Sequence, residues 1–186
     1  MKKVLALVLA MMFCFCAVAE STPSITAEDL VKVEVVDPAG STIAIIIEPV
    51  EIDETKELTW VENEIKTMGD VIAAGESPAT VFDADTQAQL AAMYGDAELQ
   101  VMEADMIYAM LNGNEPADVA IKVEFPTVYT EEQQPALVIG VPNEDGTAVW
   151  TVIPMNFVEE DMFADFEMEL VEKLAEVDGV VFVVNI

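Results

Sequence analysis

Carboxylates dominate the side chains of this sequence that could do chemistry. The 186 residues include 36 Asp and Glu, no His and no Arg, and both Cys lie within the first 19 residues. Beyond those residues, neither Ser/His/Asp and Cys/His catalysis nor the usual zinc coordination can be assembled. Two carboxylates alone can hydrolyse a glycosidic bond. The pairs that are close in sequence are Glu103 with Asp105 and Glu159 with Asp161.

In so acidic a chain, close pairs also arise by chance, and a solvated acidic face is the simpler interpretation. We therefore expect a protein that is not an enzyme. A glycoside hydrolase that uses carboxylates alone is kept as the alternative.

Clustered carboxylates can also bind calcium. Asp83-Ala84-Asp85 resembles the start of a calcium loop, but an EF-hand then requires Gly and Glu where this chain has Ala88 and Tyr94. Asp83 and Asp85 are better explained as residues that begin a helix. The remaining candidates for weak calcium binding are Glu144, Asp145, Glu159, Glu160 and Asp161.

Four aromatic residues could form a platform for a sugar ring: Trp60, Trp150, Tyr108 and Tyr129. Trp150 lies in the middle of an apolar run and Trp60 at the expected start of a helix, so core packing explains both better. Tyr129 stands in a polar stretch and is expected near the surface. A carbohydrate-binding domain is the second alternative.

The N-terminus has the pattern of a secretory signal peptide. Two lysines precede an almost wholly apolar run, 4–18, and Ala17-Val18-Ala19 forms an A-x-A cleavage site before Glu20. The apolar run is shorter than the ~20 residues that span a bilayer, so no membrane span should remain after cleavage. The residues before Cys14 and Cys16 are not the small ones that lipidation requires. The sequence thus predicts a secreted, extracellular protein.

Charge narrows the choice of partner. The chain that follows the signal peptide has five lysines against 36 carboxylates, a formal charge of 5 − 36 = −31. Such a surface repels phosphate backbones and anionic lipids, which excludes nucleic acid and membrane surfaces as partners. It attracts cations and basic molecules, so we expect an unidentified protein or glycan partner, with a basic one favoured by charge.

The spacing of apolar residues and the helix-capping signals predict an α+β region at 20–113. Residues 31–50 are typical of a β-hairpin. Thr59 and Glu62 form a capping box for a helix that ends at Gly75. A second helix is predicted over 85–94, and 96–111 fits either a helix or, as favoured here, a strand.

A β-sandwich-like region is predicted at 114–186. Three successive strands, within 118–154, are expected to form one sheet, and the last two flank a hairpin loop that contains Asp145-Gly146. A strand at 161–166, a helix at 167–177 and a strand at 180–185 follow. Leu170, Leu174 and Val177 should face inward from the helix, and the last strand, apolar on both faces, should be interior.

The chain also resembles a group of known proteins. The similarity is carried by Val71, Asp83, Leu90, Leu99, Phe125, Tyr129, Leu137, Asn143, Gly146, Trp150 and the Val-rich C-terminal strand. With these residues the chain is similar to uncharacterised exported proteins of Gram-positive gut bacteria, whose C-terminal part resembles an immunoglobulin-like β-sandwich. The resemblance implies that fold and an exported location, and it brings no activity and no functional residue.

Overall fold

A computed structural model describes residues 35–36, 42–112, 121–125, 130–158 and 161–186. Its helices are α2 (Trp60–Ala74), α3 (Ala84–Tyr94) and α4 (Met168–Glu176), with short 3-10 helices η1 (Pro78–Val81) and η2 (Glu131–Gln133). Its strands are β1 (Val35–Val36), β2 (Thr42–Pro49), β3 (Gln100–Asn112), β4 (Ile121–Phe125), β5 (Ala136–Pro142), β6 (Ala148–Pro154), β7 (Asn156–Val158), β8 (Asp161–Phe166) and β9 (Gly179–Asn185).

These strands form two antiparallel sheets, and the fold is α+β. The larger sheet has six strands in the order β1-β2-β3-β9-β5-β6, and the smaller has three in the order β4-β8-β7. In the centre of the larger sheet, every residue of β9 is buried, as are all but the last of β5. The prediction that the last strand is interior is confirmed, because β9 lies between β3 and β5.

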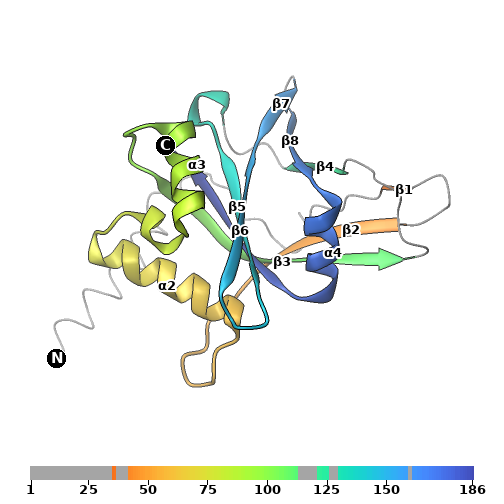
Figure 1. The fold of residues 1–186 in the computed structure, drawn as a ribbon, viewed down its shortest axis with the longest axis horizontal. Coiled ribbons are helices and arrows are strands. Elements are labelled where there is room, and N and C mark those ends of the chain that lie inside the picture. Colours follow the sequence, from red (N-terminus) through yellow and green to blue (C-terminus); the bar gives the residue numbers. More distant parts are fainter. Residues whose placement is uncertain (1–34, 37–41, 113–120, 126–129, 159–160) are drawn as a thin grey trace.

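Helices cover one face of the larger sheet. Val180, Phe182 and Val184 of β9 join a core cluster with residues of α2, α3 and η1. Phe182 contacts Phe82, which follows η1, with ring centroids 5.9 Å apart. Figure 1 shows α2 and α3 together on one side of the strands and α4 on the other.

The smaller sheet and α4 cover the opposite face. Val181 and Val183 of β9 belong to a second core cluster, which includes Met162 and Phe166 of β8 and Leu174 of α4. The alternation of β9 between the two clusters follows from the two-residue period of a strand. The larger sheet is therefore the middle layer of three.

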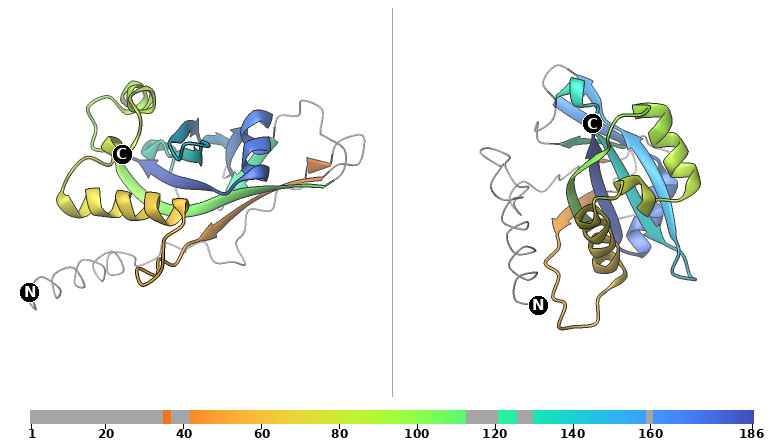
Figure 2. Two further views of the ribbon diagram at one scale, coloured as in Figure 1. Left: turned by 60° about the horizontal axis from the view of Figure 1, so that its bottom comes forward. Right: turned by 90° about the vertical axis from the view of Figure 1, so that its left-hand side faces the viewer.

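The long strand β3 links the two ends of the larger sheet. Its residues 105–112 pair with β2, and residues 100–107 pair with β9 through a register shift between Val101 and Glu103. Figure 2 shows β3 running past α2 to the distant end of the sheet, where β2 lies beside it. The larger sheet thus takes strands from both sides of the predicted boundary at residue 113.

Local signals account for the helices. The Thr59 side chain accepts a hydrogen bond from the Glu62 amide, the Glu62 carboxylate accepts one from the Thr59 amide, and Gly75 ends α2 with a φ of 74°. These are the predicted capping box and a left-handed C-cap that favours glycine. Asp83 caps α3 by accepting from the Thr86 amide. The strand favoured within 96–111 is confirmed as β3.

Two expectations are wrong. The three successive strands do not share a sheet, because β4 pairs with β8 in the smaller sheet, whereas β5 and β6 pair in the larger one. Alternation in a sequence specifies which face of a strand is buried and leaves its partner open. Val177 does not face inward either: it is 39% exposed and adopts an extended conformation at the end of α4.

Candidate functional site

A groove of about 500 Å³ lies between the edge strand β6 and helix α4. Its floor is apolar and includes Val141, Ile153 and Leu170, each less than 10% exposed. Its polar side chains are Thr151, Asn156, Asp165, Glu167, Glu169 and Lys173. We call this surface the β6–α4 groove.

Local structure explains why carboxylates gather at the groove. Asp165 points away from the core because its neighbours in β8, Ala164 and Phe166, are buried. Glu167 is the N-cap residue of α4, and Glu169 lies in its first turn. Carboxylates at this end of a helix are stabilised by the positive end of the helix dipole.

The polar side chains of the groove are partly paired with one another. The Lys173 Nζ donates to Glu169 Oε1 at 2.9 Å, and this bond lowers the pKa of Glu169. The Asn156 side-chain amide donates to Asp165 Oδ2 at 3.2 Å. The described residues that line the groove include three carboxylates and one lysine, a formal charge of 1 − 3 = −2. The site therefore favours cationic groups.

The groove adjoins an open sheet edge. β6 is the last strand of the larger sheet, and within the described residues it pairs with β5 alone. Val149, Thr151, Val152 and Ile153 line the groove, and the side chains of Trp150 and Val152 pack against the helical layer. One side of β6 is therefore held in place, and its outer edge borders the groove.

The hairpin loop before β6 is fixed by two sets of hydrogen bonds. The Trp60 indole Nε1 donates to the carbonyl oxygen of Gly146 at 3.2 Å. Asp145 Oδ1 accepts from the amide and the hydroxyl of Thr147, at 3.0 and 2.6 Å. These bonds lower the pKa of Asp145. The calcium candidate Asp145 thus stabilises its own turn, while Glu144 is exposed.

The other calcium candidates are not brought into this site. Glu159 and Glu160 lie outside the described residues, and Asp161 begins β8, where only its backbone is described. In the described part of the chain, no three carboxylates form a group that could hold a metal ion.

The carboxylates of the pair Glu103 and Asp105 lie on β3 and away from the groove. In the register of β3 and β9, Glu103 lies opposite Val183 and Asp105 lies opposite Val181, so the two acidic side chains are on one face of the sheet. Burial raises the pKa of Asp105. The second predicted pair, Glu159 with Asp161, cannot be placed, because Glu159 is outside the described residues.

The aromatic candidates are dispersed. The Trp150 ring packs edge-on against Phe82, with centroids 5.0 Å apart, and 6.0 Å from Phe182. Core packing is therefore confirmed for Trp150. Trp60 holds the hairpin loop, and the Tyr108 hydroxyl donates to Glu48 at 3.0 Å. The predicted surface residue Tyr129 and the cleavage-site residues Ala17, Ala19 and Glu20 lie outside the described residues.

Comparison of the chain with protein-family models, with curated proteins and with solved structures found no match. Among the described residues, no helix is long and apolar enough to cross a membrane.

Sequence reasoning missed the groove itself. Its residues come from β5, β6, β7, β8 and α4, which are brought together only by the pairing of the strands and the position of the helix. One signal was available: Thr151 is a polar residue in an otherwise apolar strand. Its position marks the face of β6 that opens on the groove.

Proposed function

We propose that the chain is a secreted, acidic, non-enzymatic binding module of the bacterial cell exterior, and that the β6–α4 groove binds a cationic segment of a partner polypeptide. The observation that carries this proposal is the combination of a buried apolar floor with three carboxylates at the groove, of which Glu169 is paired with Lys173. Binding of this kind needs no cofactor.

The chemistry of the groove favours lysine and arginine side chains. Their hydrocarbon stems can cover apolar surface while the charged heads reach carboxylates. Val141, Ile153 and Leu170 supply that apolar surface, and the exposed Asp165 and Glu167 supply the charges. The large negative charge of the whole chain adds long-range attraction for such a partner.

The arrangement of carboxylates supports a role in binding over hydrolysis. Asp105, whose raised pKa would suit a general acid, does not line the groove, and neither does Glu103. A screen of the mature protein, residues 20–186, against glycan and ester substrates tests this part of the proposal. Reproducible turnover of any substrate would overturn it.

We also propose that the C-terminal region is β-sandwich-like, as its resemblance to immunoglobulin-like modules suggests. Support comes from the packing of Met162 and Phe166 of the smaller sheet in one core cluster with Leu137 and Ile139 of the larger sheet. An experimental structure of the mature protein, compared with immunoglobulin-like domains, tests this relationship. A topology with no counterpart among them would overturn it.

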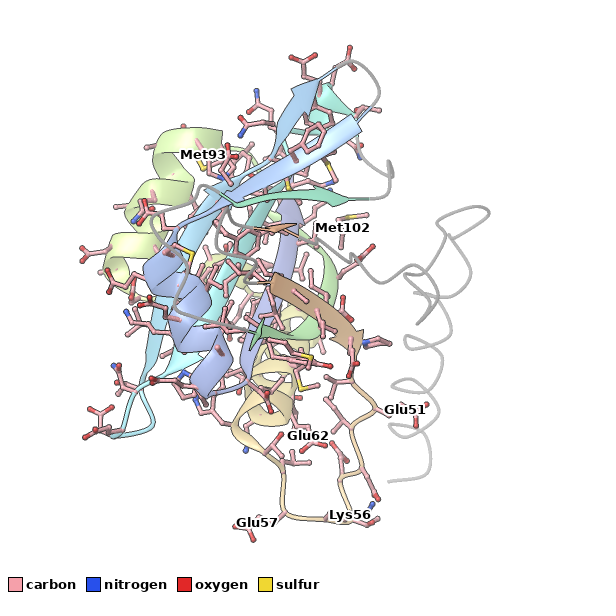
Figure 3. The ribbon with its side chains drawn as sticks, turned by 90° about the vertical axis from the view of Figure 1, so that its right-hand side faces the viewer. Glu51, Lys56, Glu57, Glu62, Met93 and Met102 are labelled. Atoms are coloured by element: carbon pink, nitrogen blue, oxygen red, sulfur yellow. The ribbon has the colours of Figure 1, made fainter. Side chains whose placement is uncertain are left out.

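The groove proposal can be tested with a cationic peptide of alternating lysine and valine. The variant Asp165→Asn, Glu167→Gln, Glu169→Gln removes the carboxylates of the groove. A matched control, Glu51→Gln, Glu57→Gln, Glu76→Gln, removes three exposed carboxylates that do not line it. Figure 3 shows Glu51 and Glu57 on the loop between β2 and α2.

We expect the groove variant to bind the peptide about tenfold more weakly than the unaltered protein at ~0.15 M salt, because up to three exposed ion pairs are lost. The control should change affinity less than about twofold, since distant exposed charges are screened. Fluorescence anisotropy of a labelled peptide measures both. Equal weakening by the two variants would show that only the overall charge matters and would overturn the groove as the site.

A further inference from the structure

Among the described residues no strand lies beside the outer edge of β6, and the directions of its backbone groups follow from two hydrogen bonds. The Asn143 amide donates to Thr147 O at 2.7 Å, and the Met155 amide donates to Pro135 O at 3.0 Å. Hydrogen-bonded and non-bonded pairs alternate along an antiparallel ladder. With the register of β5 and β6, Val149, Thr151 and Ile153 therefore bond to β5. The N–H and C=O groups of Ala148, Trp150 and Val152 point outward.

The sequence of β6 lacks the devices that normally protect such an edge. Exposed edges are usually blocked by lysine, by inward-pointing charge or by proline within the strand. β6 reads Ala-Val-Trp-Thr-Val-Ile-Pro, with no charged residue, and its one proline is the last residue. The residues of β6 themselves therefore do not block pairing with another strand.

We propose that the cationic segment of the partner adds to β6 as an antiparallel strand, with lysine or arginine at every second position. This inference rests on the proposed function of the groove. Antiparallel pairing matches the rest of the larger sheet and is the more stable arrangement for each residue. Main-chain hydrogen bonds to Trp150 and Val152 supply affinity, and the groove supplies selectivity.

The faces of β6 determine where the basic side chains belong. Residues of the added strand opposite Thr151 and Ile153 project on the groove side, toward the carboxylates of β8 and α4. Residues opposite Trp150 and Val152 project on the side of the helical layer, where apolar side chains fit. Alternate residues on one face are about 6 to 7 Å apart, so each basic residue can meet a different carboxylate.

A second copy of this chain is the competing occupant of the edge. Two copies would bring together bodies that each have a formal charge of −31 after signal cleavage, and each would place its acidic groove beside the other. Like charges in contact oppose such pairing. Sedimentation of the mature protein should show a monomer, and a dimer that disappears on Val152→Pro would overturn the proposal.

The deciding experiment uses three peptides of identical sequence, with lysine and valine alternating. One is unmodified, one is N-methylated on its valine amides, and one is N-methylated on its lysine amides. In an antiparallel pair, the residues opposite Trp150 and Val152 exchange hydrogen bonds with them, and these residues are the valines. Methylation of valine amides removes those donors, whereas the lysine amides point away from β6.

We expect the valine-methylated peptide to bind at least about tenfold more weakly than the unmodified one, and the lysine-methylated peptide to bind within about threefold of it. Hydrogen exchange should show new protection of the Trp150 and Val152 amides in the complex. Equal effects of the two methylation patterns, or the opposite preference, would overturn antiparallel strand addition.

Failure of this inference can be distinguished from failure of the proposed function. Binding that is weakened by Asp165→Asn, Glu167→Gln, Glu169→Gln but is insensitive to methylation would keep the groove as a cation-binding surface and exclude strand addition. No binding of the unmodified peptide would overturn both.

Discussion

The two faces of β6 differ in what lies against them. On one face, Trp150 packs against Phe82 and Phe182 in a cluster with the helical layer. On the other, Thr151 and Ile153 open on a groove of about 500 Å³ next to α4. The same strand is thus fixed from one side and accessible from the other.

This difference shows how a rigid surface can be offered at the edge of a sheet. A binding surface holds its shape when its supporting side chains are locked by packing. In this protein, β6 is held by the packing of the Trp150 ring and by the hydrogen bond from Trp60 to the hairpin loop. On the groove side, Ile153 belongs to the core cluster beneath the smaller sheet, and Thr151 lies outside both clusters.

The largest expected effect contrasts the two faces directly. Trp150→Ala should lower the free energy of unfolding by about 3 to 5 kcal/mol, because it removes a large ring from a packed cluster. Its control on the groove face, Thr151→Ala, should cost less than about 1 kcal/mol. Urea unfolding measures both. Similar losses would show that both faces of β6 contribute to stability and would end the distinction.

A second contrast concerns the backbone beneath Trp150. A Cβ atom added at Gly140 would lie 2.5 Å from Cζ3 of the Trp150 ring. Gly140→Ala should therefore cost about 1 to 3 kcal/mol through overpacking. Gly69→Ala is the control, because nothing lies within 4 Å of its added Cβ in the middle of α2. This control should stabilise the protein by about 0.5 to 1 kcal/mol.

Thermal melts of the Gly140 and Gly69 variants supply the measurement. A Gly140→Ala protein as stable as the unaltered one would mean that the Trp150 ring can move away at little cost. The face that we describe as fixed would then be adaptable.

Most helices and strands can be predicted from the sequence, but the pairing of the strands cannot. The capping box of Thr59 and Glu62 and the terminal Gly75 predicted α2, because these signals act within one turn of the chain. The pattern of β4 predicted a strand but placed it in the wrong sheet. Pairing depends on long-range contacts that alternation does not encode.

The candidate site was less predictable than the fold for the same physical reason. The carboxylates singled out from the sequence, such as Asp145 and Asp105, are used in a turn or half-buried in β3. Those at the groove, such as Asp165 and Glu167, are neighbours of β6 only through the packing of β8 and α4. No local spacing distinguishes them from other acidic residues.

A third prediction compares the half-buried Asp105 with the exposed carboxylates of the groove. Burial raises the pKa of Asp105 in the folded protein above its unfolded value of about 3.9. Its contribution to stability is therefore fully present below that unfolded value and is lost as pH rises through the folded pKa. Asp105→Asn should melt at a higher temperature than the unaltered protein at pH 7, and the difference should vanish below about pH 3.9.

Melting temperatures measured from pH 3 to pH 8 test this prediction. Glu167→Gln, which removes a carboxylate at an exposed position, is the control. A constant difference between Asp105→Asn and the unaltered protein over the whole range would show that the effect comes from packing and not from titration.

The smallest expected effect is the change in melting temperature when the groove carboxylates are removed. The contrast between the two faces of β6 depends on it. Asp165→Asn, Glu167→Gln and Glu169→Gln, alone or together, should lower the melting temperature only slightly, because exposed ion pairs and exposed charges at a helix end contribute little to stability. In a chain with a formal charge of −29, removing carboxylates also relieves repulsion, which offsets part of this loss. The same three substitutions are expected to weaken peptide binding about tenfold. Melts and binding curves recorded in one buffer would show whether the groove carboxylates serve the fold or the partner: a clear drop in melting temperature would assign them to the fold, and β6 would then be structural on both faces.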